Sequence, residues 1–256
     1  MNNESKTRGL MVKKSIFKER RKILAGLGRA IASFWLSLVW PLRWALAKGN
    51  TQYLEDVMKL PQAKTQGIVT VEQAIDQRRT VRSYKPTMLS LDQLAQLLWS
   101  AQGITGNKGG KRAAPSAGAL YPMDVYVVAG QGCVAQIEAG VYHYEPDRHM
   151  LSKVAKNDLR DGMARAALSQ MWIARAPVNL VITAEYNRVG VKYGERGVRY
   201  AMIEAGHIGQ NFFLQAEALG LKAGIVGAFH DTKLKKILNL PRAHEPLLIM
   251  PVGYSA

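Results

Sequence analysis

The sequence predicts an α+β fold, and three observations support that class. Helix-like and strand-like segments are mixed along the chain without a regular βαβ repeat. Residues 176–184 form a nearly continuous apolar run, which is typical of a buried strand. The chain has 256 residues, of which 48% are hydrophobic and 21% are charged, so it is long enough and apolar enough to build a globular core.

Residues 1–50 have the character of a leader rather than of the folded domain. They carry +9 of the net charge of +16. The run Arg20-Arg21-Lys22-Ile23-Leu24 resembles a twin-arginine export signal, and Ala45-Leu46-Ala47 matches the small-x-small pattern that signal peptidase accepts. We therefore expect export to the periplasm. Two alternatives stay open: a membrane-surface anchor formed by the basic segment with Trp35, Trp40 and Trp44, and a cytoplasmic protein with a helical extension.

Composition excludes several classes of function. The basic residues of the body are not interleaved with aromatic residues in a Lys/Arg ladder, so nucleic-acid binding is not expected. A single cysteine, Cys133, excludes an internal disulfide and a cysteine-based zinc site. His143 and His149 lack metal-ligand spacing and are interpreted as structural, and we expect no metal.

The body divides into a linker over residues 51–69 and one folded domain over residues 70–256. Thr70 is a plausible cap for a first helix, and Ser90 for a second. Glycines at 103–110 indicate a flexible loop. Beyond these features, the patterns predict helices at 151–169, 199–219 and before Leu238, and strands at 125–128, 141–146, 176–184 and 246–254.

A loop of small residues between two prolines precedes the first predicted strand. Pro115-Ser116-Ala117-Gly118-Ala119-Leu120-Tyr121-Pro122 allows backbone N–H groups to approach a flat or anionic ligand. An ordinary loop that feeds a core strand explains the same letters. The loop decides between these interpretations only together with the rest of the chain.

Five motifs together resemble the FMN-dependent nitroreductase superfamily over residues 70–254, in the branch of azoline-oxidising dehydrogenases that form thiazole and oxazole rings. In chain order the motifs are Arg78-Arg79-Thr80-Val81-Arg82-Ser83-Tyr84, Pro115 to Pro122, Lys192-Tyr193-Gly194-Glu195-Arg196, Glu204-Ala205-Gly206-His207-Ile208-Gly209-Gln210-Asn211, and Pro251-Val252-Gly253-Tyr254. The resemblance implies a mostly antiparallel sheet surrounded by helices, and a homodimer with FMN at the interface.

The resemblance also implies which residues bind the flavin. Arginine offers bidentate hydrogen bonds to a phosphate. The predicted cofactor-binding residues are Arg78, Arg79 and Thr80 for the phosphate and flavin, with Arg82 as a helper; Ser116, Ala117 and Gly118 against the ring from the second subunit; and Ile225, Val226 and Gly227 over its opposite side. A solvated helix end and a simple helix-to-strand turn are the alternatives for the first and last groups.

Lys192 and Tyr193 resemble the catalytic pair of azoline oxidases. A buried lysine beside a tyrosine can act as a base or polarise a substrate. A surface pair without chemistry is the alternative. Glu204, His207, Gln210 and Asn211 are interpreted as helix-packing and hydrogen-bonding residues rather than catalytic ones.

These features predict an FMN-dependent oxidoreductase that transfers a hydride between flavin N5 and a small-molecule or peptide-borne substrate. One alternative is a nitro or quinone reductase with NAD(P)H as electron donor. Ordinary nitroreductases have a Ser-Ser-x-Asn loop and a glutamate near the flavin, where this chain has Ala117, Gly118 and Val226, so this alternative is less favoured. A third is a membrane-surface flavin-binding protein without turnover.

Overall fold

The computed structural model describes residues 57–106 and 110–256 and shows one seven-stranded sheet. The strand order is β1-β4-β3-β2-β5-β7-β6, and all six pairings are antiparallel. The strands are β1 (Val57–Lys59), β2 (Met123–Ala129), β3 (Gly140–Glu145), β4 (Met150–Lys156), β5 (Val178–Ala184), β6 (Lys222–Ala223) and β7 (Glu245–Gly253). The predicted α+β class and antiparallel sheet are confirmed.

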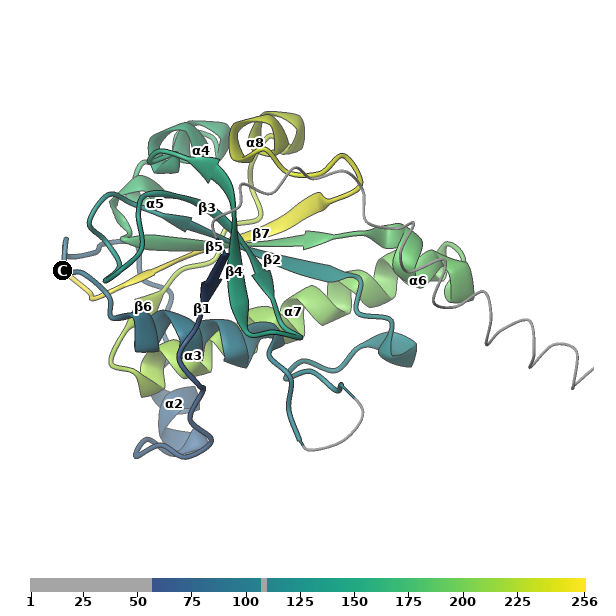
Figure 1. Cartoon of the computed structure of the whole chain (residues 1–256), viewed down its shortest axis with the longest axis horizontal. Helices are drawn as coiled ribbons and strands as arrows, with labels where there is room; N and C mark the ends of the chain where they lie inside the picture. The colour runs from purple at the N-terminus through teal and green to yellow at the C-terminus, as the bar shows by residue number, and fades with distance from the viewer. Residues whose placement is uncertain (1–56, 107–109) are drawn as a thin grey trace, which may run out of the picture. The chain divides into compact units, whose positions relative to one another are not determined.

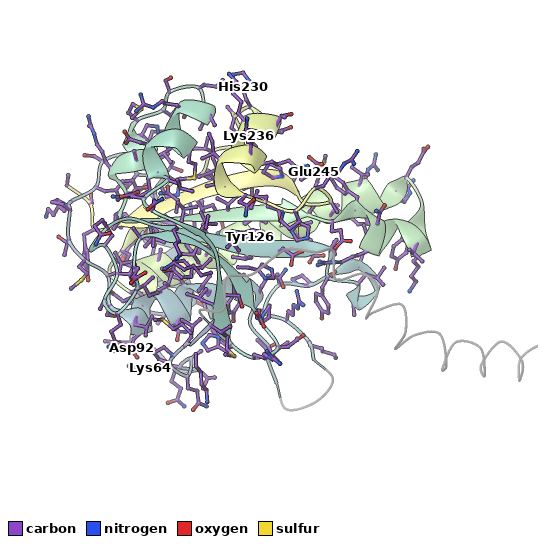
Figure 2. All side chains as sticks on the ribbon, turned by 45° about the horizontal axis from the view of Figure 1, so that its top comes forward. Lys64, Asp92, Tyr126, His230, Lys236 and Glu245 are labelled. Atoms are coloured by element: carbon purple, nitrogen blue, oxygen red, sulfur yellow. The ribbon has the colours of Figure 1, made fainter. Side chains whose placement is uncertain are left out.

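Helices cover both faces of the sheet (Figure 1). On one face lie α2 (Val71–Gln77), α3 (Leu91–Gln102) and α7 (Arg196–Ala218). On the other face lie α4 (Arg160–Ala166), α5 (Trp172–Arg175) and α8 (Asp231–Leu238), while α6 (Tyr186–Tyr193) lies at one end of the sheet. Figure 2 shows His230 and Lys236 on one side of the sheet and Lys64 and Asp92 on the other, with Tyr126 between them.

The central strands are apolar on both faces because each face is covered by helices. Every residue of β5 is buried, as the continuous apolar run predicted. Alternate residues of β2 enter two separate core clusters: Val125 and Val127 pack with α3 and α7, whereas Tyr126 and Val128 pack with α4 and α8. The sheet is thus the middle layer of the domain, and α7 packs against one of its faces.

The first two helices start where the sequence predicts. The Thr70 and Ser90 hydroxyls accept hydrogen bonds from the N–H groups of Gln73 and Gln93, and each glutamine side chain bonds back to the cap residue. These capping boxes fix the starts of α2 and α3. The prediction of the longest helix is also confirmed, with a start three residues earlier than expected.

The prediction of one helix over residues 151–169 is wrong. Met150–Lys156 is strand β4, paired with β1 and β3, and only Arg160–Ala166 is helical. Ser152 and Lys153 are buried, which removes the alternation that marks a half-exposed strand. Their polar groups are satisfied by Glu145 and Glu138 from neighbouring segments.

Residues 51–69, predicted to be a linker, contribute strand β1 to the edge of the sheet. Leu60 N–H donates to the His149 carbonyl at 3.0 Å, and His149 Nε2 bonds the Pro61 carbonyl at 2.9 Å. The predicted leader, with its export and anchor alternatives, lies outside the described residues and stays a prediction. Within residues 57–106 and 110–256, no helix is long and apolar enough to cross a membrane.

Candidate functional site

The predicted phosphate segment and the predicted flavin-covering turn lie side by side. Thr80 forms a parallel bridge with Ala223, and Val81 N–H donates to the Ala223 carbonyl at 2.9 Å. Residues 78–82 therefore run along β6, directly before the turn of residues 225–227. The structure brings together these two groups of predicted cofactor-binding residues, which are about 145 positions apart in the sequence.

Three arginines of this segment keep their charges uncompensated by carboxylates. The Arg78 guanidinium lies over the Phe213 ring at 5.1 Å, and that of Arg82 lies over Trp172 at 5.7 Å. Arg79 Nη1 donates to the carbonyls of Asp76 (2.7 Å) and Arg78 (2.8 Å) at the end of α2. In the part of the chain that the structure describes, none of the three forms an ion pair. The segment is suited to an anion.

The turn at residues 225–227 presents only part of what the sequence predicts. Val226 is 4% exposed, and its N–H and carbonyl are bonded to Ile249 at 2.8 and 2.9 Å. Since main-chain groups alternate in direction along extended backbone, those of Ile225 and Gly227 point away from β7. Ile225 and Gly227 can therefore contact a ligand, whereas Val226 supports the turn from below.

A second group forms where the small-residue loop meets the end of α6. Gly118 has φ +62°, and a Cβ at this position would lie 2.8 Å from Tyr193 Oη and 3.0 Å from Lys192 Nζ. Lys192 Nζ lies 5.3 Å from the centre of the Tyr193 ring, and Lys192 is exposed. The structure places Ser116, Ala117 and Gly118 beside the predicted catalytic pair. Burial of Lys192 would have to come from a ligand or a second chain.

A chain of hydrogen bonds connects the small-residue loop to α3 and α7. We call Gln102, Arg112, Ser116, Tyr121 and Glu204 the Glu204 network. Gln102 Nε2 donates to Glu204 Oε1 (3.3 Å), Arg112 Nη1 to Gln102 Oε1 (3.4 Å), Arg112 N–H to Tyr121 Oη (3.3 Å) and Tyr121 N–H to Ser116 Oγ (2.9 Å). The Glu204 carboxyl lies close to the Ser116 side chain, which lowers the pKa of Glu204 and opposes the increase caused by burial.

The Glu204 network stabilises an uncommon backbone conformation. Ala119 and Tyr121, which are not glycines, have φ of +54° and +46°. The Arg112 guanidinium lies 4.6 Å from the Tyr121 ring centre and covers it. Such conformations cost free energy and persist only where surrounding contacts enforce them, which is common at functional sites. Here the hydrogen bonds of the Glu204 network to Tyr121 help to maintain these backbone conformations.

Within one chain, the arginine segment lies far from the small-residue loop and the Lys192–Tyr193 pair. Tyr193 contacts Tyr200, near the start of α7, with ring centres 5.0 Å apart. Arg78 contacts Phe213, near the end of the same helix. At 1.5 Å per residue, these two contact points on α7 are separated by about 20 Å. The small-residue loop and the arginine segment of a single chain therefore do not enclose one compact site.

A buried charged cluster lies at the ends of β2 and β5, at positions that the sequence analysis did not select. Oxygen and nitrogen atoms of Asp124, Glu185 and His244 lie within 4.8 Å of one another. Arg188 already bridges the two carboxylates, with Nη1 2.7 Å from Asp124 Oδ2 and Nε 2.6 Å from Glu185 Oε2. His143 Nε2 lies 2.9 Å from Asp124 Oδ1.

The electrostatics of this cluster mark it as structural. Burial alone would raise the pKa of Asp124, but the hydrogen bond to His143 and the charge of Arg188 outweigh it and hold the pKa far below its ordinary value. A divalent cation at the same place would meet the guanidinium. His143, interpreted as structural from sequence, thus lies where it ties β3 to β2.

Comparisons with known proteins agree with this fold. The profile of the Nitroreductase family matches residues 75–254. The chain belongs to the nitroreductase family. Membership of this family makes it an oxidoreductase, and the resemblance to the nitroreductase superfamily noted from the sequence is confirmed.

Family relatives include two kinds of protein. A Methanocaldococcus jannaschii protein named as a nitroreductase, MJ1384, is 42% identical over 185 residues, which cover 72% of this chain and 91% of that protein. The Escherichia coli microcin B17-processing protein McbC is 29% identical over 169 residues, 64% of this chain and 62% of McbC.

One of the similar solved structures is that of a multiprotein complex. The E. coli microcin synthetase McbBCD complex with truncated pro-MccB17 bound contains a chain with 25% identity and a TM-score of 0.62. The match covers 81% of this chain and 79% of that one.

Sequence reasoning missed most of the Glu204 network. Gln102 closes α3 and Arg112 precedes the small-residue loop, so neither belongs to a motif, and Tyr121, although it lies within the Pro115 to Pro122 motif, was given no role of its own. One signal was available: Glu204 lies on the apolar face of α7, four residues before Ile208 and eight before Phe212. A carboxylate on a core-facing stripe needs partners, and that requirement points to a network.

Proposed function

We propose that this nitroreductase-family protein is an FMN-dependent dehydrogenase acting on a small-molecule or peptide-borne substrate. The observation that supports it most is that Arg78, Arg79 and Arg82, none of which forms an ion pair with a described residue, lie on one short segment beside β6, next to the turn of Ile225 and Gly227. This arrangement fits a ligand with a doubly charged phosphate at one end and an apolar ring at the other.

The site is proposed to be completed by a second copy of the chain. The two groups of predicted residues lie about 20 Å apart along α7 within one chain, so an antiparallel pairing of two chains would bring them together. The exposed side of α7 supports this pairing: Met202 and Ile203 are 55% and 51% exposed, and no neighbouring group among the described residues lies within 4 Å of the Cβ position of Gly206.

Each group of residues has a distinct proposed role. Arg78, Arg79 and Thr80 would hold the phosphate of FMN, Ile225 and Gly227 one side of its ring, and Ser116–Gly118 of the second chain the other side. When bound, FMN supplies the hydride chemistry. Lys192 Nζ, beside the Tyr193 ring, would accept the substrate proton as a neutral amine once a second chain and the substrate bury it, and Tyr193 would orient the substrate through its hydroxyl.

Two substrate directions are supported by different relatives. The likeness to McbC and to the pro-MccB17-bound complex supports a peptide-borne substrate that is oxidised. The 42% identity to a protein named as a nitroreductase supports the reductive alternative with NAD(P)H. Stopped-flow mixing with NAD(P)H distinguishes them, because a reductase flavin is bleached rapidly and a dehydrogenase flavin stays oxidised.

The flavin assignment is tested by the spectrum of the purified full chain. We expect bound FMN, released and identified after denaturation. The double substitution Arg78→Ala with Arg79→Ala should reduce flavin content at least tenfold, since two charge-assisted contacts to the phosphate are lost. Arg165→Ala, which removes an exposed arginine on α4, is the control. Unchanged flavin content in the double variant would refute the phosphate assignment.

A further inference from the structure

Helix α6 carries the predicted catalytic pair but has little contact with the hydrophobic core. Lys192 and Tyr193 are its last two residues, and Val189 is the one residue of its eight that is buried. A helix this short is marginally stable in water by itself. Contacts outside the core therefore determine where the pair lies.

Arg188 provides such contacts in the first turn of α6. Its Nη1 lies 2.7 Å from Asp124 Oδ2, and its Nε lies 2.6 Å from Glu185 Oε2. Nη1 also donates to the Tyr121 carbonyl at 3.4 Å, and the Glu185 N–H donates to the Pro122 carbonyl at 2.8 Å. The start of α6 is thus bonded to the place where the small-residue loop enters β2. The planar guanidinium gives these contacts a fixed direction.

Arg188 and Lys192 lie on the same face of α6. They are four residues apart, a spacing that makes two side chains neighbours on the surface of a helix. Both reach the small-residue loop, Arg188 at Tyr121 and Lys192 at Gly118, where a Cβ would lie 3.0 Å from Lys192 Nζ. The helix therefore runs along the loop, held at its start by Arg188 and presenting Lys192 at its end.

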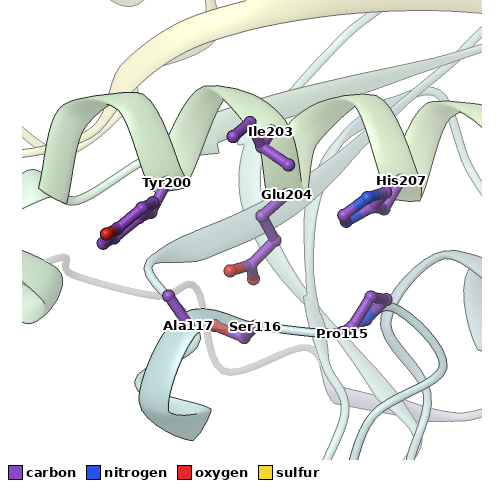
Figure 3. A pocket seen from close by; sticks show the side chains of 7 residues that line it. All are labelled: Pro115, Ser116, Ala117, Tyr200, Ile203, Glu204 and His207. Atoms are coloured by element: carbon purple, nitrogen blue, oxygen red, sulfur yellow. The ribbon is translucent and has the colours of Figure 1, made fainter. Parts of the chain in front are cut away.

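The Tyr193 ring is a sensitive marker of where the end of α6 lies. It contacts Tyr200 edge to face, with ring centres 5.0 Å apart. Figure 3 shows Tyr200 projecting from α7 toward the loop at Ala117, and these two residues line one pocket. Since aromatic pairs have preferred geometries, a displacement of α6 changes the contact between the two tyrosines.

We propose that Arg188 is a positioning residue for the Lys192–Tyr193 pair. By fixing the start of α6 to Asp124 and Glu185, it sets the distance between Lys192 Nζ and the small-residue loop. A displacement of about 1 Å at a reacting group can slow a reaction about a hundredfold, so Arg188 affects the rate without touching the substrate. This role rests on the catalytic function proposed above for the pair.

Fluorine NMR of the full chain labelled with 3-fluorotyrosine tests the position of the pair. Tyr193→Phe identifies the Tyr193 signal by its loss. In Arg188→Gln this signal should move, by more than its line width, toward its position in the urea-unfolded chain, because the contact with Tyr200 is loosened.

Arg160→Gln is the matched control. Arg160 is a partly buried arginine on the opposite face of the sheet, and its Nη2 lies 2.7 Å from Asp158 Oδ2. Its substitution also removes an ion pair but should leave the Tyr193 signal in place. A signal that moves in neither variant, or equally in both, would overturn the proposal.

Two further variants keep the test decisive. Arg188→Lys keeps the charge but not the planar fork, so its signal should lie between those of the unaltered protein and of Arg188→Gln. A signal no closer to the unaltered position than that of Arg188→Gln would contradict the proposal. Should Arg188→Gln fail to fold, Glu185→Gln combined with Arg188→Gln removes an opposite charge together with the arginine, and the same shift is expected.

A rate measurement separates this proposal from the proposed function. Flavin-loaded protein is mixed without oxygen with a thiazoline-bearing dipeptide, and reduction of the flavin is followed by stopped flow. In Arg188→Gln the limiting rate should fall about tenfold at an unchanged half-saturating concentration, since geometry rather than binding is lost. An unchanged limiting rate would refute the positioning role. If this probe does not reduce the flavin of the unaltered protein, the proposed dehydrogenase function fails, and the fluorine signal alone decides the role of Arg188.

Discussion

Gly118 connects a backbone requirement to the predicted catalytic pair. Its φ of +62° is unfavourable for residues with a Cβ, and a Cβ there would lie only 2.8 Å from Tyr193 Oη and 3.0 Å from Lys192 Nζ. Glycine at this position therefore serves two purposes, conformation and close approach. Gly132 has a φ of +64°, but no atom of the described residues crowds its Cβ position, so only the backbone conformation favours glycine there.

The pair of glycines yields a controlled prediction. Gly132→Ala should lower the free energy of unfolding by about 1 kcal/mol, the usual cost of a Cβ in this region. Gly118→Ala should cost more, about 2 kcal/mol, because Lys192 and Tyr193 must also move. Urea denaturation of both variants measures the difference. Equal losses would show that the contact with the pair contributes nothing.

His149 predicts how stability depends on pH. Its Nδ1 lies 2.8 Å from Tyr144 Oη and its Nε2 2.9 Å from the Pro61 carbonyl, so the neutral ring donates to one and accepts from the other. Burial lowers the pKa of His149 below its ordinary value of 6.5. Below that pH the unfolded chain binds a proton that the folded chain does not, and stability must decrease as the pH falls.

The measurement is the urea midpoint between pH 7.5 and 5. We expect it to decrease below pH 6.5 in the unaltered protein and to decrease less steeply in His149→Asn, a substitution that tolerates the φ of +50°. His244, whose pKa burial also lowers, contributes to the remaining slope. Identical slopes in the two proteins would exclude His149 as a source.

At the scale of elements, sequence patterns correctly predicted those helices and strands that are determined by interactions between residues close together in the sequence. Capping boxes fixed the starts of α2 and α3, and a wholly apolar run identified β5. Strand β4 was misjudged because Leu151 and Val154 are spaced as on a helix while Ser152 and Lys153 break the apolar run. Their burial depends on Glu145 and Glu138, and no pattern within residues 150–156 contains that information.

The candidate site divides in the same way. Arg78, Gly118 and Lys192 could be selected because each belongs to a motif with its own chemistry. Gln102, Arg112 and Asp124 could not, since their roles arise only when α3, the loop and β2 are placed against other segments.

At the scale of the whole molecule, α7 is proposed to pair with its counterpart in a second copy. Gly206 is the sharpest place to test this, since no atom of the described residues beyond its own stretch of helix lies within 4 Å of its Cβ position. Gly206→Arg should leave the monomer fold intact, because arginine favours a helix over glycine. It should block the close approach of two helices.

Light scattering on the eluting protein measures the outcome. We expect a dimer for the unaltered chain and a monomer with strongly reduced flavin content for Gly206→Arg. Gly190→Arg, in α6, also has nothing within 4 Å and is the control. A Gly206→Arg protein that stays dimeric and keeps its flavin would contradict the arrangement.

Strand β1 has a consequence for how this protein tolerates proteolysis. It covers the outer edge of β4, where Met150–Ser152 would otherwise expose unpaired main-chain groups to other molecules. A variant that starts at Thr51 keeps this cover, and we expect it to remain monodisperse in light scattering. A variant that starts at Pro61 uncovers the edge and should aggregate. Cleavage before Val57 would therefore keep β1 paired with β4, whereas cleavage four residues later would expose the edge of β4 and favour self-association.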